Sequence, residues 1–170
     1  MDEDLTDKPD DKLEDKPDTN LDHEFSDDPA RVDRDAVWTF LSTHAYWGLW
    51  RTREIVDGQI DGAWRVVGAY TPAGEMVGFA RAVSDGVSLA YVADVFVDPA
   101  HRGQGLSVGL LRTLIDEGPG AHFRWMLHTA DAHGLYAKFG FAPPDGRYLE
   151  RPAMSNLGAG SLTAGSDPAS

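Results

Sequence analysis

The segment 89–107 constrains the fold more than any other, because it predicts a buried strand, a tight loop and a helix in direct succession. Residues 89–97, with the sequence LAYVADVFV, are apolar on both faces, which is typical of a central strand covered on two sides. Pro99 ends this strand, and a loop with two glycines leads directly into an amphipathic helix. Glycines let successive backbone N–H groups point inward, and the start of the helix adds partial positive charge. The segment therefore predicts an anion site.

The anion expected in this loop is a pyrophosphate, and Arg102 supplies a full positive charge. The loop lacks the Gly-Lys-Ser/Thr of a Walker A motif and the three-glycine spacing of a Rossmann fold. Taken alone, a short glycine loop is equally typical of a tight strand-to-helix turn that binds nothing. Its function has to be decided by the rest of the chain.

Local patterns on either side predict a mixed α/β fold, with a mostly antiparallel central sheet flanked by helices. Asp33 and Thr52 are suited to begin two early helices, and the turn 71–74 joins two strands into a hairpin. Asp131 is expected to cap a short helix that ends at Gly140. In chain order, the predicted elements are helices at 34–42 and from 52, strands at 64–70, 76–83 and 89–97, a helix at 106–117, a strand at 123–128, a helix at 132–139 and a last strand at 148–151.

Both ends of the chain differ in composition from this domain. Residues 1–24 are acidic and poor in large apolar side chains, so we expect a disordered tail. Residues 25–154 are assigned to the domain, and residues 155–170, rich in Ser, Gly and Ala, to a flexible C-terminal tail. Residues 1–28 hold 13 acidic and 3 basic side chains, so most of the net charge of −13 belongs to the N-terminal end. The domain itself is nearly neutral, which argues against a nucleic-acid partner.

Composition argues against several other classes of protein. No run approaches the roughly 18 to 20 apolar residues of a membrane span, and the polar N-terminus resembles neither a secretory nor a transit peptide. We therefore expect a cytoplasmic protein without a membrane partner. The chain has no cysteine, which excludes disulfides, thiolate metal sites and a covalent acyl-cysteine. The histidines show no metal-ligand spacing, so no metal is expected.

Two motifs, in the right order and on the right predicted elements, resemble the GNAT superfamily of N-acetyltransferases. Residues 102–107, RGQGLS, are similar to the Gln/Arg-x-x-Gly-x-Gly/Ala loop that binds the pyrophosphate of acetyl-CoA, with Ser107 at the last position. Residues 135–141, LYAKFGF, resemble the family's Leu-Tyr-x-x-x-Gly-Phe signature. The resemblance covers about residues 25 to 152 and implies a GNAT-like fold.

The resemblance also implies acetyl-CoA as cosubstrate. In the family the signature tyrosine, here Tyr136, protonates the departing CoA thiolate; the alternative is a tyrosine that only packs in the core. Thr129 stands where the family often has an asparagine. The residues that the resemblance assigns to acetyl-CoA are Val95, Phe96, Val97, Arg102, Gly103, Gln104, Gly105, Leu106, Ser107 and Thr129.

Two further residues are candidates for taking the proton from the acceptor. Asp94 interrupts an apolar strand, where a carboxylate costs several kcal/mol unless it has partners or lines a cleft. In GNAT folds this strand borders the acyl-transfer site, so Asp94 is a candidate general base; a structural ion pair, or a carboxylate that only orients the substrate, is the alternative. His128 ends the neighbouring strand and is a candidate base or a partner for Asp94, with a hydrogen-bonded structural histidine as the alternative.

An aromatic stretch between the two early helices, residues 46–51 with the sequence YWGLWR, is the candidate acceptor site. In GNAT folds this connection commonly walls the acceptor, so Tyr46, Trp47 and Arg51 are expected to bind substrate. Arg51 or Arg53 is suited to hold an acceptor carboxylate. The alternative is that these aromatic residues fill the core between the two helices.

The sequence therefore predicts an N-acetyltransferase that moves an acetyl group from acetyl-CoA to a primary amine by direct attack in a ternary complex. The alternative is a GNAT-like module that binds or senses acyl-CoA without turnover. Within the enzyme interpretation, a small-molecule amine is the expected acceptor, and a protein N-terminus or lysine is the alternative, because a fold does not fix the substrate. A homodimer is compatible with the sequence.

Overall fold

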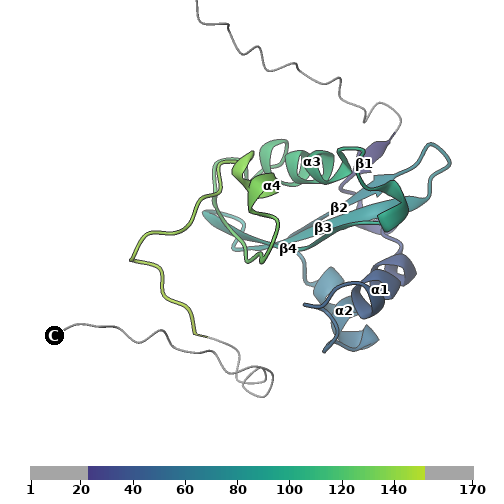
Figure 1. Cartoon of the computed structure of the whole chain (residues 1–170), viewed down its shortest axis with the longest axis horizontal. Coiled ribbons are helices and arrows are strands. Elements are labelled where there is room, and N and C mark those ends of the chain that lie inside the picture. The colour runs from purple at the N-terminus through teal and green to yellow at the C-terminus, as the bar shows by residue number, and fades with distance from the viewer. Residues whose placement is uncertain (1–22, 152–170) are drawn as a thin grey trace, which may run out of the picture.

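The computed structural model describes residues 23–151, so most of both predicted tails and residues 152–154 of the predicted domain lie outside the described residues. A sheet forms the centre, with helices on both of its faces (Figure 1). The elements in chain order are β1 (Glu24–Ser26), a 3₁₀ turn (Pro29–Arg31), α1 (Arg34–Thr43), α2 (Arg53–Asp61), β2 (Arg65–Tyr70), β3 (Met76–Ser84), β4 (Leu89–Val97), a second 3₁₀ turn (Pro99–His101), α3 (Leu106–Leu111) with a π-helical continuation (Arg112–Asp116), β5 (Arg124–Met126) and α4 (His133–Ala137).

The sheet has five strands in the order β1-β2-β3-β4-β5, and only the β4–β5 pair is parallel. The predicted mixed α/β class and mostly antiparallel sheet are therefore confirmed. One strand was missed, and one strand prediction is wrong. Residues 24–26 form the edge strand β1, within and just beyond the predicted tail, because they pair with the end of β2. Residues 148–151 form no strand and lie exposed.

Helices α1 and α2 begin at the residues that the sequence predicts. The Asp33 carboxylate accepts hydrogen bonds from the backbone N–H groups of Asp35 and Ala36, both at 3.0 Å. The Thr52 hydroxyl accepts from the N–H of Ile55 at 3.4 Å. The helices then bury their apolar stripes, which consist of Val37, Phe40 and Leu41 in α1 and Val56 and Ile60 in α2.

We expect the Asp33→Ala variant to lose about 1 kcal/mol of unfolding free energy, because two N–H groups in the first turn of α1 lose their acceptor. Urea denaturation should show a lower midpoint with an unchanged slope. A midpoint equal to that of the unmodified protein would contradict a stabilising cap at this position.

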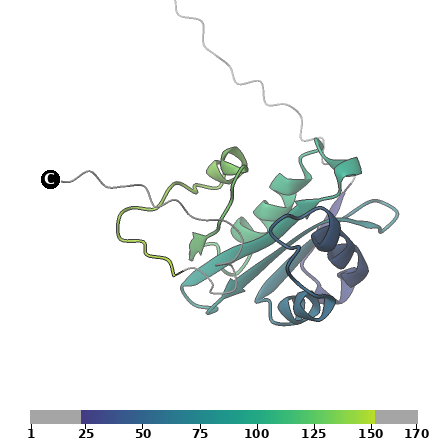
Figure 2. The ribbon, with the colours of Figure 1, turned by 60° about the horizontal axis from the view of Figure 1, so that its bottom comes forward.

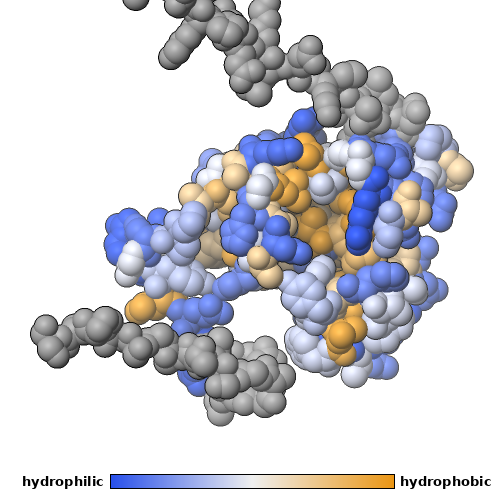
Figure 3. Space-filling view, viewed as in Figure 1, coloured by the Kyte–Doolittle hydropathy of each residue, from blue (hydrophilic) through white to orange (hydrophobic). Residues whose placement is uncertain are grey.

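The two faces of the sheet carry separate halves of the core. Helices α1 and α2 cover one face, and α3 with α4 beside it covers the other (Figures 1 and 2). On the first face Phe40 stacks on Phe96 with ring centroids 4.0 Å apart. On the second, Leu110 and Leu114 are fully buried against the sheet. The face seen in Figure 3 is mostly polar, with apolar side chains showing in its middle, around α3.

The strands buried along most of their length are β2 and β3, whereas the sequence predicted this for β4. Strand β4 pairs with β5 only over Leu89–Tyr91, so its remaining residues have no neighbour on that side. A bulge adds to the divergence: Phe79 and Arg81 of β3 pair with Phe96 and Ala93 of β4, which leaves one extra residue on β4. The second half of β4 therefore opens onto a cavity instead of continuing the sheet.

Candidate active site

Two cavities lie along the open half of β4. The larger has a volume of about 590 Å³ and the smaller one of about 300 Å³. Four residues line both of them, namely Trp47, Val95, Ala132 and Tyr136. The cavities are therefore neighbours that share a wall, and a molecule that fills one can react with a molecule that fills the other.

The smaller cavity contains the predicted anion loop. Gly103 and Gly105 have φ angles of +77° and +78°, in the left-handed region that favours glycine. The backbone N–H groups of residues 103–107 donate to no acceptor within residues 23–151. Arg102 lines the same cavity, and its Nε donates to the Val97 carbonyl at 3.3 Å. The loop therefore offers several free donors and one cation to an anion.

Most residues that the sequence assigns to acetyl-CoA lie together. All of those in the segments 95–97 and 102–107 line the smaller cavity, with the exception of Gln104. Thr129 lines the larger cavity instead. Its hydroxyl accepts a hydrogen bond from the N–H of Ala132 at 3.0 Å, directly before α4. The predicted cap by Asp131 is wrong, because Thr129 makes the side-chain contact at this helix start and Asp131 makes none.

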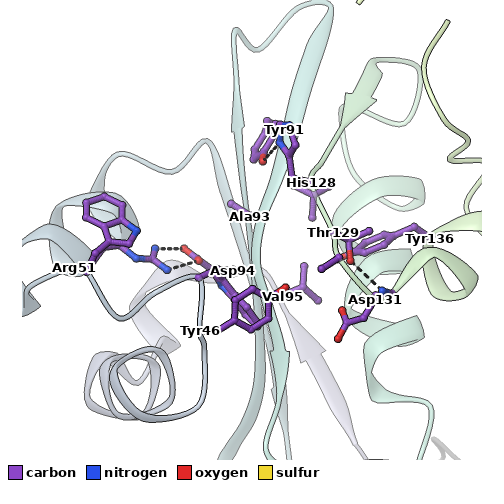
Figure 4. A pocket seen from close by; sticks show the side chains of 15 residues that line it. Tyr46, Arg51, Tyr91, Ala93, Asp94, Val95, His128, Thr129, Asp131 and Tyr136 are labelled. Carbon is purple, nitrogen blue, oxygen red and sulfur yellow. Dashed lines mark hydrogen bonds and ion pairs between the residues drawn. The ribbon is translucent and has the colours of Figure 1, made fainter. Parts of the chain in front are cut away.

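Tyr136 lies on α4, at the junction of the two cavities (Figure 4). Its side chain is buried, yet its hydroxyl has no hydrogen-bond partner within residues 23–151. Burial raises the pKa of the phenol, and the negative charges of Asp131 and ionised Tyr91 raise it further. The hydroxyl therefore keeps its proton at neutral pH and is free to donate it.

Asp94 lies in the bulge of β4 with a φ of +51°, which is uncommon for a residue other than glycine. Arg51 holds its carboxylate in a bidentate pair with both N–O distances at 2.9 Å, and Arg81 donates from Nε at 2.6 Å. Burial raises the pKa of Asp94, but the hydrogen bonds and charges of the two arginines outweigh it, so the pKa lies below its ordinary value. This geometry favours the ion pair over the general base as the interpretation of Asp94.

His128 does not pair with Asp94, as the sequence suggested it might do. Its Nδ1 lies 2.7 Å from the Tyr91 hydroxyl, and its Nε2 lies 3.2 Å from a Glu150 carboxylate oxygen. A carboxylate only accepts hydrogen bonds, so Nε2 carries the hydrogen and Nδ1 accepts from Tyr91. Tyr91, His128 and Glu150 thus form a chain that begins at the larger cavity, and Figure 4 shows its first contact, between Tyr91 and His128.

The predicted acceptor residues Tyr46, Trp47 and Arg51 all line the larger cavity. Tyr46 and Trp47 are 62% and 41% exposed, so they do not fill the core between α1 and α2. Both arginines are already paired with carboxylates of the chain itself, and the role of either in holding an acceptor carboxylate stays a prediction. Arg51 is bound to Asp94, and Arg53 is bound to Asp35 and Asp57 outside the cavity.

Trp50, Tyr91 and Asp131 are among the further residues that line the larger cavity without having been predicted individually for it. Trp50 belongs to the same aromatic stretch as Tyr46, so its place could have been read from the sequence. Tyr91 lies on β4, three residues before Asp94, and only the divergence of β4 from β5 brings it to the cavity. Within the described range 23–151, no group of acidic and histidine side chains is placed to bind a metal, and no helix is long and apolar enough to cross a bilayer.

Comparison with known proteins agrees with this geometry. Residues 35–141 match the model of the acetyltransferase (GNAT) family. A Gibberella zeae protein named as an acetyltransferase is 33% identical over 106 residues, which are 61% of this chain and 58% of that protein. The chain therefore spans less than two thirds of this relative.

Solved structures of GNAT proteins have the same fold. A Xanthomonas campestris protein assigned to the GNAT family is 34% identical, with a TM-score of 0.72 over 77% of this chain and 93% of that one. A Clostridium acetobutylicum protein classed as an acetyltransferase, crystallised with acetyl-CoA, is 15% identical, with a TM-score of 0.54 over 76% of this chain and 96% of that one. The second likeness shows the fold alone. The family match, which spans both motifs and the two cavities, shows that this chain belongs to the GNAT family of acetyltransferases.

Proposed function

We propose that this protein is an N-acetyltransferase that moves an acetyl group from acetyl-CoA to a primary amine, with both substrates bound at once. The observation that carries the proposal is the position of Tyr136, whose free hydroxyl lies where an anion-binding cavity meets an aromatic one. Direct transfer fits the chain, because it has no cysteine to carry an acyl group.

The smaller cavity suits acetyl-CoA, because the free N–H groups of residues 103–107 and the Arg102 side chain are donors for a pyrophosphate. Residues 95–97 continue the wall from this loop toward the larger cavity. When bound, acetyl-CoA supplies an acetyl group that is activated as a thioester. The larger cavity is left for the amine.

Tyr136 acts as the general acid in this proposal. A departing thiolate needs a proton, and the Tyr136 hydroxyl is protonated and has no hydrogen-bond partner within residues 23–151, at the junction of the two cavities. The same raised pKa makes a phenolate at this position unfavourable, so the residue acts as a proton donor and not as a base.

The chain Tyr91–His128–Glu150 takes the proton from the amine. The Tyr91 hydroxyl accepts that proton while its own proton passes to Nδ1 of His128. The imidazolium that forms is stabilised by the Glu150 carboxylate, which accepts from Nε2. Burial raises the pKa of Tyr91 by more than a hydrogen bond from the His128 backbone lowers it, so Tyr91 stays neutral between turnovers and serves as a relay. Asp94 takes no proton in this scheme.

A thiol-release assay tests the proposal. With acetyl-CoA and a panel of primary amines, we expect free CoA to appear only when an amine is present, together with an acetylated product by mass spectrometry. A protein that binds CoA, seen as a rise in melting temperature, but releases no thiol with any amine, peptide N-terminus or lysine peptide would be a binding module instead.

A further inference from the structure

We propose that the Arg51–Asp94 pair determines which acceptor this site takes: it holds the aromatic wall of the larger cavity in place and occupies the guanidinium that, within residues 23–151, alone lines it. The acceptor is therefore an amine with an aromatic or alkyl body and no acidic group. This inference rests on the proposed acetyl transfer and adds the chemical class of the acceptor.

The aromatic wall, residues 45–51, is a run of turns attached to the protein along one side. The N–H of Gly48 donates to Ala45 O at 2.7 Å and that of Arg51 donates to Gly48 O at 3.0 Å, a three-residue repeat. Residues 45, 48 and 51 are accordingly buried, whereas Tyr46, Trp47, Leu49 and Trp50 are exposed. A Cβ at Gly48 would lie 2.8 Å from Leu41 O and 3.0 Å from Nη2 of Arg51, so the wall packs closely on its own anchor.

Arg51 is the polar anchor of this wall. Its side chain is 4% exposed and that of Asp94 is 5% exposed, so their bidentate contact is shielded from solvent. Arg51 Nη1 also donates to Gln59 of α2 at 2.8 Å, which ties the wall to the helix that follows it. The bulge in β4, with Asp94 at positive φ, is what aims the carboxylate at this arginine. The pair therefore joins the wall to the strand on which the reaction takes place.

The contacts of Asp94 leave the cavity without a free cation among the described residues. Arg51 donates from both Nη atoms to Asp94, and His128 is bonded through both ring nitrogens. Arg81 brings one excess positive charge to Asp94, but its side chain does not line the cavity. Asp131 is the charged side chain of this lining that has no hydrogen-bond or ion-pair partner within residues 23–151. Its carboxylate accepts hydrogen bonds and cannot act as the missing cation.

These groups favour one class of acceptor. A carboxylate or phosphate would enter the cavity without a counter-ion, and an unpaired charge is costly to desolvate. An amine with an aromatic or alkyl body meets the faces of Tyr46, Trp47 and Trp50, and a second ammonium group meets Asp131 or a ring face. The cavity therefore disfavours acidic acceptors mainly because it offers no positively charged partner for their acidic group.

Matched acceptors test this selection. Tryptamine and tryptophan share one ring and one primary amine and differ by a carboxylate; tryptophanamide keeps the added bulk without the charge. Cadaverine, lysine and lysinamide form a second set. In each set we expect the acid to have a kcat/KM at least about 100-fold below that of both counterparts that lack the carboxylate. Equal or better use of the acids, or acetylation of acidic amines alone, would overturn the inference. Acetylation of no amine at all would instead contradict the proposed function.

The Asp94→Asn variant separates selection from simple folding. It removes the charge that neutralises Arg51, so an acceptor carboxylate can replace it. We expect the KM for the amines without a carboxylate to rise at least about 10-fold. The ratio of their kcat/KM to that of the acids should fall at least about 10-fold. If Asp94 had only a structural role, the substitution would lower kcat/KM for amines and acids equally and leave the ratio between them unchanged. That result would also count against the inference.

The chain offers a control for this variant. Asp57 also contacts two arginines, Arg34 and Arg53, but it lies outside the cavity. The Asp57→Asn variant should leave the ratio between amines and acids unchanged. If Asp94→Asn does not fold, the matched acceptors on the unmodified protein still decide the inference. A second variant, Asp131→Asn, changes an exposed residue and should raise the KM for cadaverine more than that for tryptamine.

Discussion

The Tyr136→Phe variant is expected to lose between about 10²- and 10⁴-fold in turnover while its affinity for CoA stays the same. The substitution keeps almost the whole side-chain volume and removes only the hydroxyl, which makes no hydrogen bond within the range 23–151. Packing of α4 should therefore survive. What disappears is the proton for the departing thiolate, because the raised pKa makes this phenol a dependable donor at neutral pH. Steady-state kinetics with a saturating amine and calorimetry with CoA measure the two quantities separately.

A second tyrosine serves as the control. Tyr70 is 2% exposed, and its hydroxyl donates to Arg31 O at 3.0 Å, away from both cavities. Tyr70→Phe should lower stability slightly and leave turnover unchanged. The loss in Tyr136→Phe should also shrink for acyl donors with a more acidic leaving thiol, since such a thiolate needs less protonation. Full turnover in Tyr136→Phe would show that this tyrosine only packs.

The elements that the sequence predicts well are those with local signals. Asp33 and Thr52 contact N–H groups two or three residues away, so the starts of α1 and α2 can be read from neighbouring residues. The two hairpin strands and β4 follow in the same way from apolar runs bounded by turns. The anion loop is also local, because its glycines and its helix follow each other directly in the chain.

What the sequence could not predict depends on distant partners. It shows an isolated carboxylate at Asp94, but Arg51 lies 43 positions away and Arg81 lies 13 away. That both partners reach the carboxylate depends on a bulge that no residue type in the sequence predicts. His128 contacts Tyr91 and not Asp94 for a related reason, because the pairing of β4 with β5 ends at Tyr91. The candidate residues were thus largely identified, whereas their pairing and hence their roles were not.

The Asp131 cap illustrates a limit even for local signals. Asp131 and Thr129 are both good capping residues, and they lie two positions apart. Thr129 makes the contact to Ala132, which leaves the Asp131 carboxylate on the cavity lining. A competition of this kind is decided by how the chain leaves β5, and the sequence alone does not give that direction.

The Gly105→Asp variant should abolish the rise in melting temperature that CoA produces, because it places a carboxylate at the start of α3, in the proposed pyrophosphate loop. We expect Kd for CoA to rise at least about 100-fold, which is about 2.7 kcal/mol. Gly74→Asp is the matched control, since Gly74 has a similar φ of +86° but lies in the β2–β3 turn, outside both cavities.

Both glycines have open space where a Cβ would stand, so the two variants share the same backbone strain and the same added charge. Their difference therefore reports the anion site and not the fold. The Gly74→Asp protein should unfold at a lower temperature and still gain the full CoA shift. If Gly105→Asp gained that shift as well, the pyrophosphate would have to bind elsewhere, and the assignment of the free N–H groups of residues 103–107 would fail with it.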